Sequence, residues 1–216
     1  MKILAHRGLW EHPSEKNSKK ALLEAIKAGF GVETDLRDLD GEIVISHDMP
    51  NKGVLPLKGF LDEASQKPAF RKVIFALNIK SDGIGSQAKK ILGEYGILEN
   101  FFFFDMSAPE LYLYSQIFEK KNICTRISDI EQEPLLAGKA GWIWVDGFES
   151  DWQDWQGLAK KYPTHRLGVV SPELHASHRK ADYHIFWESL NKLDEKLIER
   201  ICLCTDFPAK AKEFFL

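Results

Sequence analysis

The stretch Val32-Glu33-Thr34-Asp35-Leu36-Arg37 is an apolar, β-prone run that carries two carboxylates. Glu33 and Asp35 are two residues apart, so in a strand both side chains leave the same face. Two carboxylates held that close repel each other unless a cation or a shared proton compensates them. The pattern therefore predicts a buried strand whose carboxylates bind a hard divalent metal.

Short apolar runs like this one recur along the whole chain and alternate with amphipathic segments. Eight runs that alternate with helices favour a closed (β/α)8 barrel, an α/β fold of the TIM-barrel type. An open, doubly wound sheet is the alternative, but no Gly-rich phosphate loop follows the first run. The eight runs are Ile3–Ala5, Gly31–Val32, Val73–Leu77, Phe101–Phe104, Ile123–Thr125, Trp142–Val145, Leu167–Val170 and Ile201–Leu203.

The segments between the runs have the periodicity of helices. Gly29 and Gly96 stand where two of these helices would end, because glycine readily adopts the left-handed conformation of a helix C-terminus. The predicted helices include Ser18–Ala28, Ser86–Tyr95, Ala108–Glu119, Asp151–Lys161 and Lys192–Arg200.

Polar residues end most of the apolar runs, and this strengthens the barrel prediction. In a (β/α)8 barrel the carboxyl ends of the strands form the rim of the active site, so functional groups collect there. Asp146 and Asp206 are interpreted as structural carboxylates, which barrel rims commonly carry. The polar residues at the ends of the runs are His6, Glu33 with Asp35, Asn78 with Lys80, Asp105, Arg126, Asp146, Ser171 and Asp206.

The run after Asp35 is predicted to fold back on itself. Asp40-Gly41 is a strong tight-turn signal flanked by β-forming residues. The resulting hairpin is expected to carry His47 back over the barrel mouth, towards Glu33 and Asp35.

The composition limits the classes of partner. The chain has 216 residues, 44% of them apolar, and no linker divides it, so one domain spanning residues 1–216 is expected. A net charge of -3 without a basic run gives no reason to expect nucleic acid as a partner. No signal peptide or membrane-spanning segment is evident. Three sparse cysteines are expected to be small core residues in a reducing cytoplasm.

Several motifs together resemble the glycerophosphodiester phosphodiesterase family, whose barrel is related to that of phosphatidylinositol-specific phosphodiesterases. The resemblance spans the chain in order and is densest in residues 5–48. The motifs are His6-Arg7-Gly8, Asn17-Ser18, Glu33-x-Asp35, Asp40-Gly41, His47-Asp48, Phe103-Phe104-Asp105 and Thr205-Asp206-x-Pro208.

The resemblance implies an enzyme that hydrolyses small-molecule glycerophosphodiesters to glycerol 3-phosphate and an alcohol. It implies that His6 and His47 are the acid/base pair, that Arg7 holds the phosphate, and that Glu33 and Asp35 bind Mg²⁺ or Ca²⁺. The chemistry of the residues agrees, because two histidines suit proton transfer near neutral pH. An arginine and a cation together can neutralise the non-bridging phosphate oxygens.

The sequence departs from the family pattern at Asn78. The family has a glutamate there as a further metal ligand, in a pattern like Glu-Ile-Lys, whereas this chain has Leu77-Asn78-Ile79-Lys80. An amide oxygen can coordinate either ion but brings no charge, so Asn78 is an expected third ligand. Lys80 fits the lysine of the family, which would face the phosphate. Lys16 stands where the family has a glutamate.

Two later motifs also suggest sites. Ser171-Pro172-Glu173 is a good helix start, and a helix N-terminus after the seventh strand could bind phosphate, so Ser171 is a predicted substrate-binding residue. His175 and His178 have near-helical spacing, but no third metal ligand is evident beside them.

Two other functions remain open on the sequence alone. The substrate's own hydroxyl could attack the phosphorus, as in cyclising lyases of related barrels, and release a cyclic phosphate. Alternatively, Asn78 could mark a degraded metal site in a barrel that binds phosphate ligands without turnover.

Overall fold

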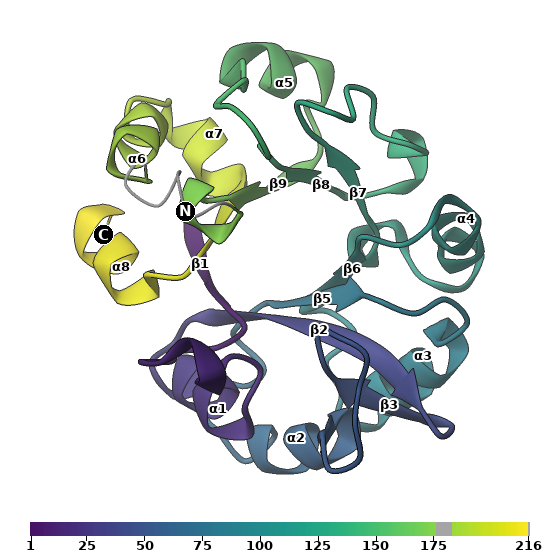
Figure 1. Ribbon diagram of the computed structural model, residues 1–216. Helices are drawn as coiled ribbons and strands as arrows, with labels where there is room; N and C mark the ends of the chain where they lie inside the picture. Colours follow the sequence, from purple (N-terminus) through teal and green to yellow (C-terminus); the bar gives the residue numbers. More distant parts are fainter. Residues whose placement is uncertain (176–182, 216) are drawn as a thin grey trace.

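The computed structural model describes residues 1–175 and 183–215, and its strands form one barrel surrounded by helices (Figure 1). Each of the eight predicted apolar runs overlaps one barrel strand, although Val73, Ile74 and Ile123 precede their strands, so the predicted (β/α)8 architecture is confirmed. The barrel strands are β1 (Lys2–His6), β2 (Gly31–Leu39), β5 (Phe75–Ile79), β6 (Phe101–Phe104), β7 (Cys124–Ile127), β8 (Trp142–Val145), β9 (Arg166–Val170) and β10 (Ile201–Thr205).

Parallel pairing closes the barrel. β1 pairs with β10, and this pairing joins the two ends of the chain. On its other side β1 pairs with β2, β2 pairs with β5, and β5 pairs with β6. β7, β8, β9 and β10 pair in that order on the other side. Between β6 and β7 a single parallel bridge among the described residues, Phe103 to Ile123, completes the circuit. All eight strands therefore present their carboxyl ends to the same side.

Helices cover the outside of the barrel, as the alternating pattern predicts. The five predicted helices are present, and three more follow β4, the segment 176–182 and β10. The helices are α1 (Lys19–Lys27), α2 (Leu57–Ala64), α3 (Gly85–Glu94), α4 (Ala108–Ile117), α5 (Trp155–Lys161), α6 (Tyr183–Asn191), α7 (Glu195–Arg200) and α8 (Pro208–Phe215), with 3₁₀ turns η1 (Pro13–Glu15), η2 (Lys120–Asn122), η3 (Ala137–Lys139) and η4 (Pro172–Leu174).

The predicted hairpin extends β2 beyond the barrel. β2 turns at Asp40-Gly41 into the antiparallel strand β3 (Glu42–Ile45), which pairs in turn with the short β4 (Leu55–Pro56). Asp40 and Gly41 have φ angles of 51° and 85°, which match the two left-handed positions of a type I′ turn. This turn carries the chain back towards the barrel mouth.

Side chains fill the barrel interior, so the barrel is a packed core rather than a pore. Phe102 stacks on Trp142 and Phe104 on Trp144, with ring centroids 4.3 and 4.1 Å apart. The three cysteines lie in the same interior, as expected for core residues: its buried members are Leu4, Ile74, Ala76, Phe102, Phe104, Cys124, Trp142, Trp144, Val170, Cys202 and Cys204. In the described part of the chain no helix is long and apolar enough to cross a membrane.

Candidate active site

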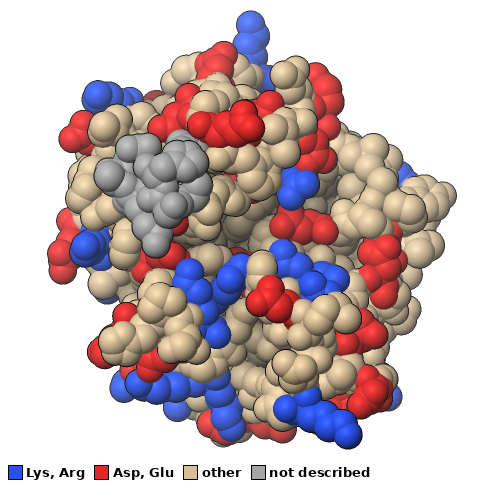
Figure 2. Space-filling model, in the orientation of Figure 1, with Lys and Arg blue, Asp and Glu red and all other residues tan. Residues whose placement is uncertain are grey.

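A cavity of about 450 Å³ opens at the carboxyl ends of the barrel strands. Figure 2 shows the hollow on the face that carries the hairpin, with Lys and Arg side chains gathered along one side of it. All the residues predicted to act on substrate line this cavity except Ser171, and of the predicted metal ligands Glu33 and Asn78 do so. Its lining is His6, Arg7, Glu33, His47, Asn78, Lys80, Phe104, Asp105, Arg126, Trp144, Asp146, Phe148, Val170, Leu174 and His175.

His6 ends β1 and is held by a carboxylate from the opposite end of the chain. Its Nδ1 lies 2.6 Å from Oδ1 of Asp206, the residue that follows β10. Lys16 Nζ donates a hydrogen bond to the other oxygen of Asp206, at 3.1 Å. Burial lowers the pKa of His6 below its ordinary value and outweighs Asp206, which raises it. His6 is therefore an oriented imidazole that is neutral near neutral pH.

Glu33 faces His6 from the neighbouring strand. The two residues are in register on β1 and β2, and His6 Nε2 lies 3.9 Å from Glu33 Oε2. Glu33 also accepts a hydrogen bond from the backbone N–H of Arg7, at 3.2 Å. Burial raises the pKa of Glu33 well above its ordinary value, and repulsion from Asp35 adds to this rise. Without a further cation, this carboxyl group holds a proton over a wider pH range than a free glutamate.

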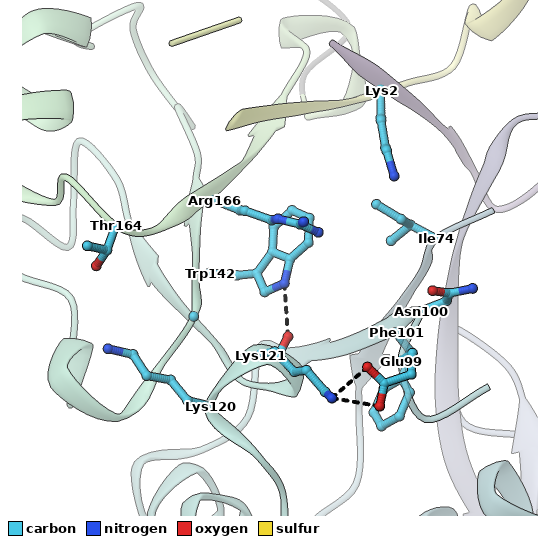
Figure 3. Close-up of a pocket in the computed structure, with 11 residues that line it drawn as sticks. Lys2, Ile74, Glu99, Asn100, Phe101, Lys120, Lys121, Trp142, Thr164 and Arg166 are labelled. Carbon is cyan, nitrogen blue, oxygen red and sulfur yellow. Dashed lines mark hydrogen bonds and ion pairs between the residues drawn. The ribbon is translucent and has the colours of Figure 1, made fainter. Parts of the chain in front are cut away.

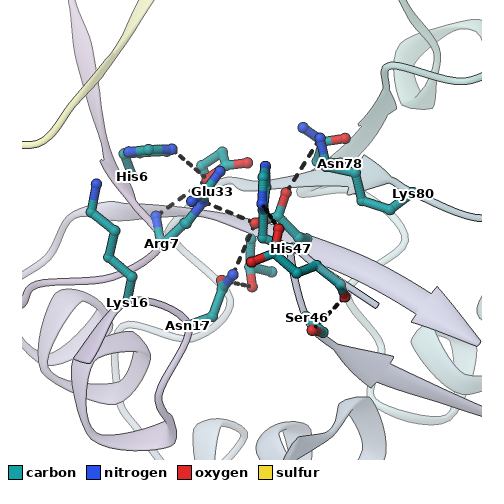
Figure 4. Close-up of polar contacts among 12 residues, drawn as sticks. His6, Arg7, Lys16, Asn17, Glu33, Ser46, His47, Asn78 and Lys80 are labelled. Carbon is teal, nitrogen blue, oxygen red and sulfur yellow. Dashed lines mark hydrogen bonds and ion pairs between the residues drawn. The ribbon is translucent and has the colours of Figure 1, made fainter. Parts of the chain in front are cut away.

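Asp35 is fully buried, and two cations lie at its carboxylate. Arg7 Nε is 2.9 Å from its Oδ2, and Lys80 Nζ is 3.6 Å from its Oδ1 (Figure 4). Asn17 Nδ2 also donates to Oδ2 at 2.8 Å, while Thr34 Oγ1 donates to the Asn17 amide oxygen. Asp35 therefore positions the arginine and lysine that the sequence predicts at the phosphate.

A sharp turn after β1 brings Arg7 to this position. Arg7 has a φ of 56°, in the left-handed region that most residues avoid. Gly8 follows with a φ of 96°, and a Cβ at this glycine would lie 2.6 Å from the backbone of Ala21 in α1. Only glycine fits this close approach, so Gly8 explains why the His-Arg-Gly sequence can turn here.

His47 reaches the cavity from the hairpin, as predicted. Arg37 fixes the loop, because its Nε donates to the His47 carbonyl and its Nη1 to the Lys80 carbonyl, both at 3.1 Å. His47 Nδ1 lies 2.8 Å from Asp48 Oδ1, and the His47 side chain is 44% exposed. His47 is thus the solvent-facing histidine of the site and His6 the buried one.

Asn78 lies beside Asp35, in register on the neighbouring strand β5. Its Nδ2 donates to Asp105 Oδ2 at 3.1 Å, so its amide oxygen faces away from that partner. The buried Oδ1 atoms of Asn78 and Asp35 each lack a hydrogen-bond donor. Two oxygens without a hydrogen-bond donor, beside the Glu33 carboxylate, are of the kind that Mg²⁺ and Ca²⁺ prefer as ligands. Among the described residues no three His, Cys, Asp or Glu side chains form a metal cluster, and the Asn78 amide would be a third protein ligand beside Glu33 and Asp35.

The cavity is also lined by residues to which the sequence analysis gave no catalytic or binding role, among them Arg126 and His175. Arg126 donates from Nη1 to Asp105 Oδ1 at 3.1 Å and from Nε to Glu131 at 2.7 Å. His175 Nε2 contacts Asp146 Oδ1, and its ring packs 4.7 Å from that of Phe148. His178, considered with His175 as a metal pair, lies outside the described residues.

Ser171 lies away from the cavity lining. Its side chain is fully buried, and its Oγ accepts a hydrogen bond from Trp187 Nε1 at 2.9 Å. The predicted helix after it is a single 3₁₀ turn, Pro172–Leu174, too short to form a helix N-terminus for phosphate. The helix prediction is wrong here because the Ser-Pro start signal says nothing about where the helix ends.

No protein-family model and no curated protein matches the chain. Solved structures do match it over nearly its whole length. The structure of a glycerophosphodiester phosphodiesterase from Parabacteroides distasonis superposes with a TM-score of 0.67 at 13% identity, covering 99% of this chain and 96% of the other. The corresponding Agrobacterium tumefaciens enzyme gives 0.68 at 14% identity, with 95% and 96% coverage.

This chain has the glycerophosphodiester phosphodiesterase fold. A Ca²⁺-dependent phosphatidylinositol-specific phospholipase C from Streptomyces antibioticus also matches, with a TM-score of 0.61 at 9% identity over 100% of this chain and 96% of the other. The resemblance predicted from the motifs is thereby confirmed at the level of the fold.

Sequence reasoning interpreted Asp206 as a structural carboxylate and missed its contact with His6 in the candidate site. Its place at the end of the last run marks it as a rim residue, but the run pattern cannot show which rim residue it contacts. The signal was available in the closure of the barrel, which makes β1 and β10 neighbours. His6 and Asp206 end those two strands, so a contact between them follows from the topology.

Proposed function

We propose that the protein hydrolyses glycerophosphodiesters, or similar small phosphodiesters, to an alcohol and glycerol 3-phosphate. The observation that carries this proposal is the convergence of a carboxylate-held His6 with Arg7, Lys80 and His47 on one cavity. The fold shared with glycerophosphodiester phosphodiesterases supports it.

The charge at the site matches a phosphodiester. Arg7 and Lys80 bring two positive charges to Asp35, which brings one negative charge, so one positive charge is left uncompensated among these three. A phosphodiester carries one negative charge. Arginine and lysine can bind the non-bridging oxygens and stabilise the charge that develops on them during attack.

The two histidines are proposed to move the protons. With Nδ1 bonded to Asp206, His6 has Nε2 available to take a proton from an attacking water, and its lowered pKa keeps that nitrogen unprotonated. The water oxygen then bonds to phosphorus as the bond from phosphorus to the leaving alkoxide breaks. His47 is proposed to give the alkoxide its proton, because it faces the cavity from the solvent side.

A divalent ion, Mg²⁺ or Ca²⁺, is proposed as cofactor. Glu33, Asp35 and Asn78 would hold it. Asp35 and Asn78 are in register on the neighbouring strands β2 and β5, and the Oδ1 atom of each lacks a hydrogen-bond donor. When bound, the ion would add positive charge at the phosphoryl oxygens. A matched structure described as Ca²⁺-dependent supports an ion of this class.

The test is turnover of a panel of glycerophosphodiesters with Mg²⁺, Ca²⁺ or EDTA, with the products identified by ³¹P NMR. The expected product is glycerol 3-phosphate, formed by the wild type and by the control His12→Ala but not by His6→Ala. A cyclic phosphate would instead establish the lyase reaction, which the phospholipase C match keeps as second candidate. Binding of the diesters without any turnover would overturn both and identify a phosphate-binding protein.

A further inference from the structure

A second hollow, of about 560 Å³, lies at the opposite end of the barrel from the candidate active site. It is built where strands begin: Lys2 starts β1, Trp142 starts β8 and Arg166 starts β9. The residues that end β1 and β9, His6 and Val170, line the other cavity. The packed barrel interior therefore separates the two hollows.

Positive charge dominates this hollow. Lys2, Lys120, Lys121 and Arg166 line it, whereas Glu99 is the one acidic residue among the described residues that line it. Lys121 already pairs with both Glu99 oxygens at 2.7 Å, and with Glu119 at 3.1 Å. Within residues 1–175 and 183–215, Lys2, Lys120 and Arg166 have no carboxylate within salt-bridge distance. Three positive charges thus remain uncompensated around one concave space.

One of these cations, Arg166, lies on a fixed aromatic ring, that of Trp142. Trp142 is fixed by a hydrogen bond from its Nε1 to the Lys121 carbonyl, at 3.0 Å, and by stacking on Phe102. The Arg166 guanidinium lies over the Trp142 ring, 5.4 Å from its centroid. Figure 3 shows Arg166 and Lys2 extending into the hollow from two sides. Stacking holds a guanidinium in place while its N–H groups stay free for an anion.

We propose that this hollow binds a small anion that carries two or more phosphate groups. Three uncompensated cations that line one concave space favour a compact polyanion, which would contact Lys2 and Arg166 while Lys120 adds positive charge at the side of the hollow. A flat membrane surface could not enter the hollow. Since the barrel core lies between the two ends, this ligand should not compete with a phosphodiester at the mouth. The proposal is independent of the function proposed above.

Calorimetric titration with inorganic pyrophosphate tests the site. The wild type is expected to bind pyrophosphate with an affinity that falls as salt rises, since exposed charges are screened. The double variant Lys2→Gln/Arg166→Gln is expected to bind at least ~10-fold more weakly, because two of its charge-assisted contacts are removed. The exposed Lys90→Gln on α3 is the matched control and should bind like the wild type. Arg166→Lys, which keeps the charge but loses the stacked guanidinium, should bind more weakly than the wild type and more tightly than the double variant.

A further variant separates this hollow from the mouth. Lys80→Gln weakens phosphate binding at the mouth and should leave pyrophosphate binding here unchanged. If Lys80→Gln abolishes binding and the double variant does not, the anion binds only at the mouth and the proposal fails. It fails equally if the folded wild type binds no pyrophosphate. Charge-dependent binding to phosphatidylglycerol vesicles without pyrophosphate binding would replace it with a membrane contact.

Discussion

His6 Nδ1 and Asp206 Oδ1, 2.6 Å apart, join the ends of the first and last barrel strands. The contact fixes the imidazole by a residue 200 positions away in the chain. It leaves Nε2 facing Glu33, so the same pair that closes the barrel at its mouth also orients the proposed base.

Loss of the His6 imidazole should abolish most of the activity. His6→Ala is expected to lower kcat on the order of 10²–10⁴-fold, the usual contribution of a positioned acid or base. Steady-state kinetics on the best diester of the panel would measure it, with His12→Ala as control. Equal rates for His6→Ala and the wild type would remove His6 from the mechanism.

The neighbours of His6 should shift the pH profile in opposite directions. Asp206 raises the pKa of His6 and Lys16 lowers it. A base works in its unprotonated form, so activity falls as pH drops through its pKa. Asp206→Asn should therefore move the acid limb of kcat/KM to lower pH, and Lys16→Gln should move it to higher pH. Shifts of the same sign in both variants would contradict the assignment of this limb to His6.

The carboxylate of Asp35 should be important for stability as well as for the site. Removing one partner of a buried ion pair leaves an uncompensated charge, at a typical cost of about 3–5 kcal/mol. Asp35→Ala is expected to lower the free energy of unfolding in urea by this order, because Arg7 would lose its buried partner. Asp48→Ala is the control, since that carboxylate is 93% exposed and its removal should change stability little. Similar losses in the two variants would mean that Asp35 has no special role.

Asn78→Asp should strengthen metal binding. The change adds a charge where the amide oxygen has no donor, and carboxylates bind Mg²⁺ and Ca²⁺ more tightly than amides do. It also removes the hydrogen bond to Asp105 and places two carboxyl groups together, so without metal the variant should be less stable. The measurement is the difference in Tm between excess Mg²⁺ or Ca²⁺ and EDTA. A difference no larger than that of the wild type would argue against an ion at Asn78.

Glu173 should make the protein less stable as pH rises. Burial raises the pKa of this carboxyl, and its Oε2 lacks a hydrogen-bond donor in the described structure. A group whose pKa is higher folded than unfolded contributes most stability below its unfolded pKa and loses it as pH rises through the folded value. Glu173→Gln should therefore lose less unfolding free energy between pH 4 and pH 7 than the wild type. The unfolding free energy of both proteins would be measured by urea denaturation at each pH. Equal changes in that free energy between pH 4 and pH 7 would contradict this prediction.

The barrel was predictable because its physical signals are local. Eight apolar runs mark its strands, and Asp40-Gly41 marks the hairpin turn by a conformation that few other residue pairs favour. The predicted rim position of Asn78 and Lys80 follows from the same alternation along β5 and the loop after it. The pairing of Arg7 and Lys80 with Asp35 was not predictable in this way, because it depends on where three separate segments meet.

The sequence analysis missed α2, although its buried residues Leu57, Phe60, Leu61 and Ala64 have the spacing of one helix face. α2 begins directly after Pro56, within a region whose turn and strand signals suggest only the hairpin. His175 enters the cavity from the short turn that replaces the predicted helix, so its contact with Asp146 depends on the length of that turn. The contact of His175 therefore depends on tertiary packing rather than on residue preference.

The single bridge between β6 and β7 makes one side of the barrel a seam. Every other neighbouring pair of barrel strands has a continuous ladder, whereas Phe103 and Ile123 alone join these two. The stacks Phe102–Trp142 and Phe104–Trp144 run from β6 to β8 and pass over β7 on the inside. Aromatic packing thus takes the place of backbone pairing there. Breathing motions of the barrel should begin along this line, and amide protons of β7 that face β6 should exchange with solvent before those of β1.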